Sequence, residues 1–197
     1  MKVRAGLLAF LLLGGLAHAQ SPARGKFLVA SRGLVDPNFS ETVVLLVDHG
    51  EEGSWGLVIN RPTAVPLSKL FPEEKALQKR DDRLFSGGPV SPGRFLLLVR
   101  SPRPPENSRP VFAEVHLASS PAVLRGPDAR VITEFRAYAG YSGWAPGQLE
   151  TEIARGDWYI LTAEAGAVFA EDPALVWATL HTRAYAPVAF LPARPLP

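Results

Sequence analysis

Two serines beside glycines come nearest in this sequence to a nucleophile for acyl transfer. Ser86 precedes two glycines, and Ser142 precedes one. A serine hydroxyl becomes a useful nucleophile when a general base lies within hydrogen-bond distance, and His49 or His116 could be that base. The sequence has no G-x-S-x-G turn, and spacing alone does not reveal the geometry of a triad. A hydrolase therefore stays an alternative, and we assign no catalytic residue.

Metal and nucleotide sites have recognisable spacings, and none is visible here. The chain has no cysteine, and His49, His116 and His181 lie far apart along it. Zinc sites need three or four clustered ligands, and both the dinucleotide and the Walker glycine motifs are missing. We therefore expect no metal and no cofactor. Gly87 and Gly88 could still form a nest of backbone N–H groups for an anion, although a tight turn would use the same residues.

The first nineteen residues have the three-part pattern of a secretory signal peptide. Basic residues in 1–4 precede an apolar run over 5–16, and Ala17-His18-Ala19 follows as a cleavage motif. The run is shorter than the roughly twenty residues that span a bilayer as a helix. We expect cleavage after Ala19, which predicts a periplasmic or secreted protein with no stable membrane anchor. The alternatives are an uncleaved anchor and a wrongly assigned start codon.

The remaining chain, residues 20–197, is long enough for one domain with a sizeable core. It carries 19 basic and 19 acidic side chains, so its formal charge is zero. The basic character of the full sequence therefore lies in its leader, and nucleic acid is not an expected partner. The expected partner is an unknown protein or a small molecule. The proline-rich end, 192–197, is expected to be a loose tail.

Apolar runs separated by turn residues predict a mostly antiparallel α+β fold. The run 42–47 is typical of a strand buried on both faces. With a returning strand at 55–60, it predicts a hairpin with a seven-residue loop, 48–54. Further strands are expected at 26–30, 94–100, 111–117, 130–138, 158–162 and 188–191, a long loop at 101–110, and a last helix at 173–180. These elements predict one domain with a bent, barrel-like sheet flanked by short helices.

The stretch 140–153 reads as a strand that ends in a glycine-bracketed turn and launches a helix. Its three glycines predict positive φ angles or close backbone approach. Pro146 suits the first position of the helix, while Arg155 and Gly156 suit its last turn and its end. Three large aromatic residues are expected to fill the junction between sheet and helix, namely Tyr141, Trp144 and Trp158.

The chain resembles the YqgE/AlgH family of bacterial proteins in five motifs that follow the family's order. They are Asp36-Pro37-Asn38-Phe39, Asp48-His49, Gly56-Leu57-Val58-Ile59-Asn60-Arg61-Pro62, Gly87-Gly88-Pro89-Val90 and the signature Gly140-Tyr141-Ser142-Gly143-Trp144 with Pro146-Gly147-Gln148-Leu149-Glu150 and Glu152-Ile153. The matches cover roughly residues 25–180. The resemblance implies a compact sheet-and-helix fold with barrel-like curvature. It also implies an association of some members with regulation of exopolysaccharide genes.

Three features depart from the family and shape the functional hypotheses. The export leader is unusual, the segment 120–126 is too short for the helix that members usually have there, and Trp55 replaces a flexible aliphatic residue or methionine. The leading hypothesis is a non-enzymatic binding or accessory protein of the cell envelope. A transcriptional regulator that touches DNA through 100–109 and a hydrolase are the alternatives. Four residues are candidates for ligand binding: Asn60, Gly87, Gly88 and Trp144.

The leader generates the first prediction. Mass spectrometry of the protein isolated from its native cell should find a chain that begins at Gln20, because the Ala17-His18-Ala19 motif directs cleavage after Ala19. An intact Met1 in the soluble cytoplasmic fraction would contradict the expected export.

Overall fold

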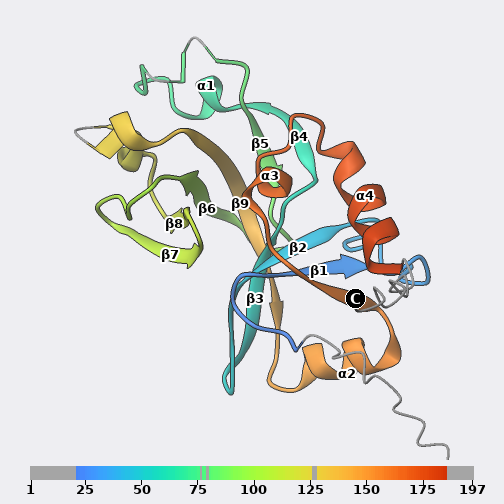
Figure 1. Ribbon diagram of the computed structural model, residues 1–197. Helices are drawn as coiled ribbons and strands as arrows, with labels where there is room; N and C mark the ends of the chain where they lie inside the picture. The colour runs from blue at the N-terminus through green and yellow to red at the C-terminus, as the bar shows by residue number, and fades with distance from the viewer. Residues whose placement is uncertain (1–20, 76, 79, 126–127, 186–197) are drawn as a thin grey trace, which may run out of the picture.

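A computed structural model describes residues 21–75, 77–78, 80–125 and 128–185 as one curled sheet with short helices (Figure 1). The strands are β1 (Lys26–Ala30), β2 (Val43–Gly50), β3 (Gly53–Val58), β4 (Pro62–Pro66), β5 (Arg83–Ser86), β6 (Val90–Arg100), β7 (Ser108–Phe112), β8 (Val115–Ala118), β9 (Glu134–Trp144) and β10 (Trp158–Thr162). The helices are α1 (Leu67–Leu70), α2 (Gln148–Arg155), α3 (Ala165–Val168) and α4 (Ala174–Tyr185), with 3-10 turns η1 (Pro121–Leu124) and η2 (Asp128–Val131). Within these ranges no helix has the length and apolar character to span a bilayer. The leader, the predicted strand 188–191 and the tail lie outside the described residues.

Strand β9 joins the two halves of the sheet. The strand order is β10-β1-β2-β3-β9-β6-β8-β7, with β5 also beside β9 and β4 beside β5. One end of β9, residues 142–144, pairs with β3, while residues 134–139 pair with β6. Every pair is antiparallel except β5 with β9. The predicted single α+β domain with a bent, mostly antiparallel, barrel-like sheet is therefore confirmed.

Strands β1 and β2 are buried on both faces of the sheet, and successive side chains along them point to opposite faces. On β1, Phe27 and Val29 belong to the core inside the half-barrel, which α4 closes with Val176 and Leu180. Leu28 belongs to a second core beneath α2. In Figure 1, α2 and α4 accordingly lie on opposite sides of β1. The prediction that the run 42–47 is buried on both faces is confirmed, since all six of its residues are buried.

The β2–β3 hairpin turns more tightly than the sequence predicted. Strand β2 continues to Gly50 and β3 begins at Gly53, so the turn is residues 51–52 and the predicted loop over 48–54 is wrong. Gly53 has φ +108°, and a Cβ there would lie 2.4 Å from the Trp144 carbonyl oxygen. Only glycine fits this position, and its conformation lets the strands extend into what looked like a polar loop.

A bulge in β2 determines which side chains of the hairpin face the half-barrel and which face α2. The register shifts between Leu46 and Asp48, so Asp48 is opposite Trp55 and His49 is opposite Ser54. A bulge of this kind adds one residue to one strand and re-aims the side chains that follow it. Asp48 thereby shares the half-barrel side with Trp55, while His49 and Ser54 share the side covered by α2.

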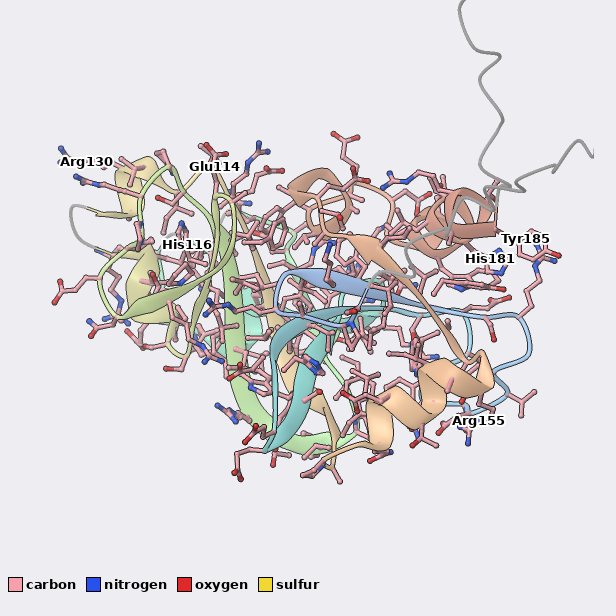
Figure 2. All side chains as sticks on the ribbon, turned by 60° about the horizontal axis from the view of Figure 1, so that its bottom comes forward. Glu114, His116, Arg130, Arg155, His181 and Tyr185 are labelled. Atoms are coloured by element: carbon pink, nitrogen blue, oxygen red, sulfur yellow. The ribbon has the colours of Figure 1, made fainter. Side chains whose placement is uncertain are left out.

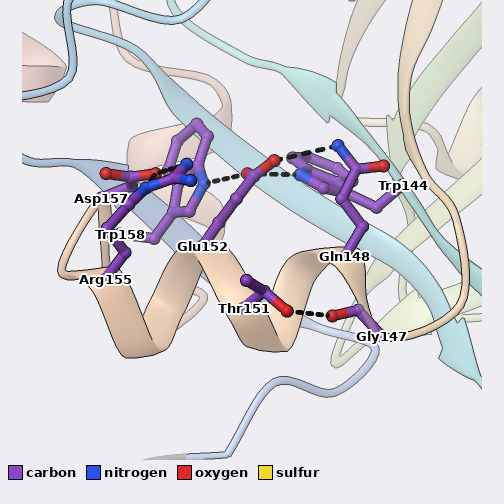
Figure 3. A network of polar contacts seen from close by, with 8 residues as sticks. All are labelled: Trp144, Gly147, Gln148, Thr151, Glu152, Arg155, Asp157 and Trp158. Atoms are coloured by element: carbon purple, nitrogen blue, oxygen red, sulfur yellow. Dashed lines mark hydrogen bonds and ion pairs between the residues drawn. The ribbon is translucent and has the colours of Figure 1, made fainter.

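Helix α2 is fastened to the sheet through one carboxylate (Figure 3). Glu152 Oε2 accepts the indole N–H of Trp144 at 2.8 Å and that of Trp158 at 2.9 Å. Its other oxygen accepts Gln148 Nε2 at 2.9 Å. Phe39 packs against both indoles, with ring centroids 5.9 and 5.6 Å away. The expected place of Trp144 and Trp158 at the junction is therefore confirmed, and the helix ends at Gly156 as predicted.

Some expectations for the signature stretch were wrong. Helix α2 begins at Gln148, after Gly147 with φ +74°, so Pro146 lies in the preceding turn. The glycines do not end the strand; Gly140, with φ +69°, lets β9 bend and continue to Trp144. Tyr141 packs against Trp55 on the half-barrel side, because neighbouring residues on a strand face opposite ways.

The predicted strand 111–117 was also wrong. It is two strands, β7 and β8, because Ala113 takes φ +41° and the chain reverses there. Strand β7 begins at Ser108, inside the predicted loop 101–110. This brings Arg109 into the sheet.

The indole–carboxylate contacts generate a stability prediction. Trp144 is 5% exposed, and Trp144→Ala should destabilise the domain by about 3–5 kcal/mol. A melting temperature lower by about 10 °C or more is expected at roughly 2–4 °C per kcal/mol. Trp55→Ala is the matched control, since Trp55 is only half-buried and should lower the melting temperature less. Equal melting temperatures for the wild type and Trp144→Ala would contradict this account.

Candidate functional site

A groove of about 1030 Å³ opens at the mouth of the half-barrel. Its walls come from the β2–β3 turn, from the irregular start of β6, and from the β7–β8 hairpin. Buried Leu96 and Leu117 contribute the apolar floor. The groove therefore collects side chains that lie far apart in the sequence.

Two arginines and two aromatic rings meet in this groove. The Trp55 and Tyr141 rings contact edge to face, with centroids 5.7 Å apart. The Arg94 guanidinium lies over both rings, 5.5 Å from the Trp55 centroid and 5.3 Å from that of Tyr141. The Arg109 guanidinium lies 4.9 Å from the Trp55 centroid. Each contact is in the range of a cation–π attraction, which holds the guanidinium while leaving its N–H groups available.

In the described chain, Arg109 has an acidic partner in the groove, whereas Arg94 and the Trp55 indole N–H do not. Arg109 lies 4.0 Å from a carboxylate oxygen of Asp48, which partly offsets its charge. Within the described part of the chain, neither Arg94 nor the indole N–H of Trp55 makes a hydrogen bond or ion pair, and Arg94 is exposed. The acidic turn residues Glu51 and Glu52 also line the groove. The groove thus offers unused hydrogen-bond donors and both signs of charge.

The structure does not gather the four predicted ligand residues into one site. Of the four, Trp144 lines the groove, but its indole N–H is bound to Glu152. Asn60 follows the end of β3 and does not line the groove. Its side chain accepts the Val43 N–H at 2.9 Å and donates to the Glu41 carbonyl at 3.0 Å. Asn60 therefore holds the segment that leads into β2. Its role in binding a ligand stays a prediction.

Gly87 and Gly88 lie where backbones cross closely. A Cβ on Gly87 would be 2.4 Å from the Gly140 carbonyl oxygen, and one on Gly88 would be 2.4 Å from Ser142 Oγ. Gly87 N–H already donates to the Ala139 carbonyl at 2.8 Å. Close packing at these two positions therefore accounts for the absence of a side chain. That their backbone N–H groups bind an anion stays a prediction.

The serine and histidine candidates do not pair as the sequence suggested. The Ser142 hydroxyl is buried and donates to the Gly87 carbonyl at 3.1 Å. His116 is buried, with Nε2 3.0 Å from the Ser101 carbonyl oxygen. Among the described residues, the hydrogen bonds of the His49 and His116 side chains go to Ser54 and Ser101, and not to Ser86.

His49 instead contacts a serine that sequence reasoning missed. Its Nδ1 lies 2.8 Å from Ser54 Oγ, and its Nε2 lies 3.7 Å from a carboxylate oxygen of Glu150. The length of the hairpin turn could have revealed this contact. With a turn of residues 51–52, residues 49 and 54 are opposite each other, whereas the predicted loop over 48–54 hid the pairing.

Other polar groups in the described chain fit structural roles. No cluster of three metal-binding side chains occurs in it, and Figure 2 shows His116 and His181 at opposite ends of the molecule.

Arg136 borders a second cavity of about 360 Å³, where it donates to the carbonyls of Val168 and Ala170 at 2.7 and 2.8 Å. Burial lowers the pKa of its guanidinium. These bonds tie β9 to the end of α3.

A family model described as DUF179, AlgH-like, matches residues 27–188. The chain belongs to the AlgH-like family. A UPF0301 protein of Streptomyces avermitilis is 38% identical over 170 residues, covering 84% of this chain and 88% of the relative. A UPF0301 protein of Rhodococcus opacus is 34% identical over 200 residues, covering 92% and 98%.

Two solved structures have the same fold as this AlgH-like chain. The solution structure of AlgH from Pseudomonas aeruginosa has a TM-score of 0.66 and 30% identity, covering 89% of this chain and 97% of that one. The crystal structure of a Corynebacterium diphtheriae protein has a TM-score of 0.72 and 23% identity, covering 86% and 90%. The predicted family is thus confirmed.

The glycine contacts of this AlgH-like domain generate a prediction. Gly87→Ala should destabilise the domain by about 1–3 kcal/mol, because the added methyl group overlaps the Gly140 carbonyl. Urea denaturation measures the change. Gly93→Ala is the control, since nothing lies within 4 Å of its Cβ position, and it should change the unfolding free energy little. Equal stability of both variants would contradict the packing role of Gly87.

Proposed function

We propose that this AlgH-like protein is a binding protein of the cell envelope that holds a ligand's negatively charged group in the groove at the half-barrel mouth. The observation that carries the proposal is Arg94. Its exposed guanidinium lies over Trp55 and Tyr141 and has no acidic partner in the described chain.

The chemistry of guanidinium supports an anionic ligand group. It presents several N–H donors in one plane and matches a carboxylate, sulfonate or phosphate bidentately, while its face remains stacked on an aromatic ring. The neighbouring Trp55 indole N–H adds one more donor. Because these groups are held by ring contacts before a ligand arrives, less conformational entropy is lost on binding.

The opposite charges at the rim support one orientation of the ligand. Glu51 and Glu52 lie on the β2–β3 turn, and their carboxylates repel an anionic group that approaches that side of the groove. The ligand's anionic group therefore faces Arg94, and its apolar or ring portion lies over Leu96 and Leu117. Trp55, which the family resemblance marked as unusual, supplies the ring that holds the guanidinium groups of Arg94 and Arg109 in the groove.

The proposed location rests on the leader pattern of residues 1–19. Export and zero formal charge in 20–197 both disfavour the alternative of a regulator that touches chromosomal DNA. That alternative would need the protein to remain in the cytoplasm.

Calorimetric titration with naphthalene-sulfonate tests the groove, because this probe combines a ring with one anionic group. Arg94→Gln should weaken its affinity ~10-fold or more, as expected for loss of a hydrogen bond to a charged group. The neutral probe naphthalene-methanol should bind the wild type more weakly and should be insensitive to this substitution.

Arg130→Gln provides the matched control. Arg130 is an exposed arginine on η2 that does not line the groove (Figure 2), so its replacement should leave the affinity unchanged. The proposal fails if Arg94→Gln binds the sulfonate as well as the wild type does, or if both arginine variants lose affinity equally.

A further inference from the structure

We propose that Ser54 is a nucleophile for esters, with His49 as its general base and Glu150 as the residue that orients the base. The three side chains come from β3, β2 and α2. His49 lies between Ser54 and Glu150 of α2. Arg94 and Trp55 meet on the half-barrel side, and Ser54 also lines the edge of that groove. The inference goes beyond the proposed function and does not depend on it.

The surroundings of the imidazole favour the tautomer that a general base needs. The Glu150 carboxylate oxygen lies 3.7 Å from Nε2, which is longer than a hydrogen bond, and its negative charge there favours the proton on Nε2. Nδ1 then carries a lone pair and accepts the Ser54 hydroxyl across the 2.8 Å contact. The same carboxylate stabilises the imidazolium that forms when Nδ1 takes the serine proton.

The hairpin holds the serine rigidly while leaving the base accessible. Ser54 is paired on both sides, with His49 of β2 and with Trp144 of β9. It is 8% exposed, and the His49 side chain is 20% exposed. A hydroxyl fixed in this way loses little entropy when it attacks, which is the advantage of a positioned nucleophile.

The reaction class is acyl transfer from an activated ester. Ser54 Oγ attacks the carbonyl carbon and gives its proton to His49 Nδ1, and the C–O bond to the leaving alcohol breaks as the alcohol takes that proton. Water then attacks the acyl-serine while His49 accepts its proton. Return of this proton to Ser54 Oγ releases the carboxylic acid and restores the enzyme. This hydrolysis requires no oxidant, reductant or metal ion.

A fluorophosphonate tests the serine directly, because attack by Oγ displaces fluoride and leaves a stable phosphonyl ester. The purified full chain is incubated with the probe and digested, and the modified residue is located by fragment mass spectrometry. We expect the adduct on Ser54. Labelling should disappear in Ser54→Ala and slow ~100-fold or more in His49→Gln, a general base being worth roughly 10²–10⁴ in rate. Ser86→Ala, which replaces the serine suggested by sequence, should label like the wild type.

Glu150 is tested by rescue, since a role in orientation acts through His49. Glu150→Gln should slow labelling, and Glu150→Asp should restore part of the rate, while both keep the wild-type melting temperature. Arg130→Gln, which replaces an exposed arginine on η2 outside the groove, should not change labelling. Sulfonate affinity and phosphonyl labelling are separate measurements on different variants, so the two proposals fail separately. The Ser54 proposal is overturned if no adduct forms on Ser54, or if folded His49→Gln labels at the wild-type rate. Either result would leave the Ser54–His49 contact as a cross-strand hydrogen bond only.

Discussion

The fold depends on one carboxylate that accepts two indole N–H groups. Glu152 Oε2 binds Trp144 at the end of β9 and Trp158 at the start of β10, and Gln148 satisfies the other oxygen. A half-buried carboxylate without partners would be costly, so the three donors also explain why a charged residue is tolerated at this junction. Through these contacts α2 fixes the two strands that frame β1, β2 and β3, and it fixes the position from which Glu150 reaches His49.

The hairpin built on that frame carries different chemistry on its two sides. The bulge after Leu46 turns Asp48 toward the half-barrel mouth with Trp55, and the next pair, His49 and Ser54, faces α2. One strand, β3, therefore carries Trp55 of the arginine–aromatic groove and, next to it, Ser54 of the serine–histidine contact, which also borders that groove. The arginine–aromatic groove and the serine–histidine contact both depend on glycine at position 53, because a side chain there would displace the end of β9.

Features set by local pattern could be predicted from the sequence, and those set by register could not. The run 42–47 and the aromatic residues Trp144 and Trp158 indicated their burial, because continuous apolar runs and large rings have few other places in a fold. The groove could not be predicted, since Trp55, Arg94 and Arg109 come from three strands whose order is set by long-range pairing. The Ser54–His49 contact depended on a bulge and a tight turn, and a one-residue error in either changes the side of every neighbouring side chain. The leader lies outside the described residues, and export stays a prediction.

Hydrogen exchange of the indole N–H groups tests most directly whether Glu152 fastens α2 to the sheet. Selective nitrogen labelling resolves the four tryptophans by NMR. The account predicts that the Trp144 and Trp158 indole protons exchange slowly and together, through unfolding of the whole domain, because one carboxylate accepts both. Trp55, whose indole N–H has no partner among the described residues, should exchange rapidly. Exchange of Trp144 and Trp158 as fast as that of Trp55, or at two unrelated rates, would contradict the account.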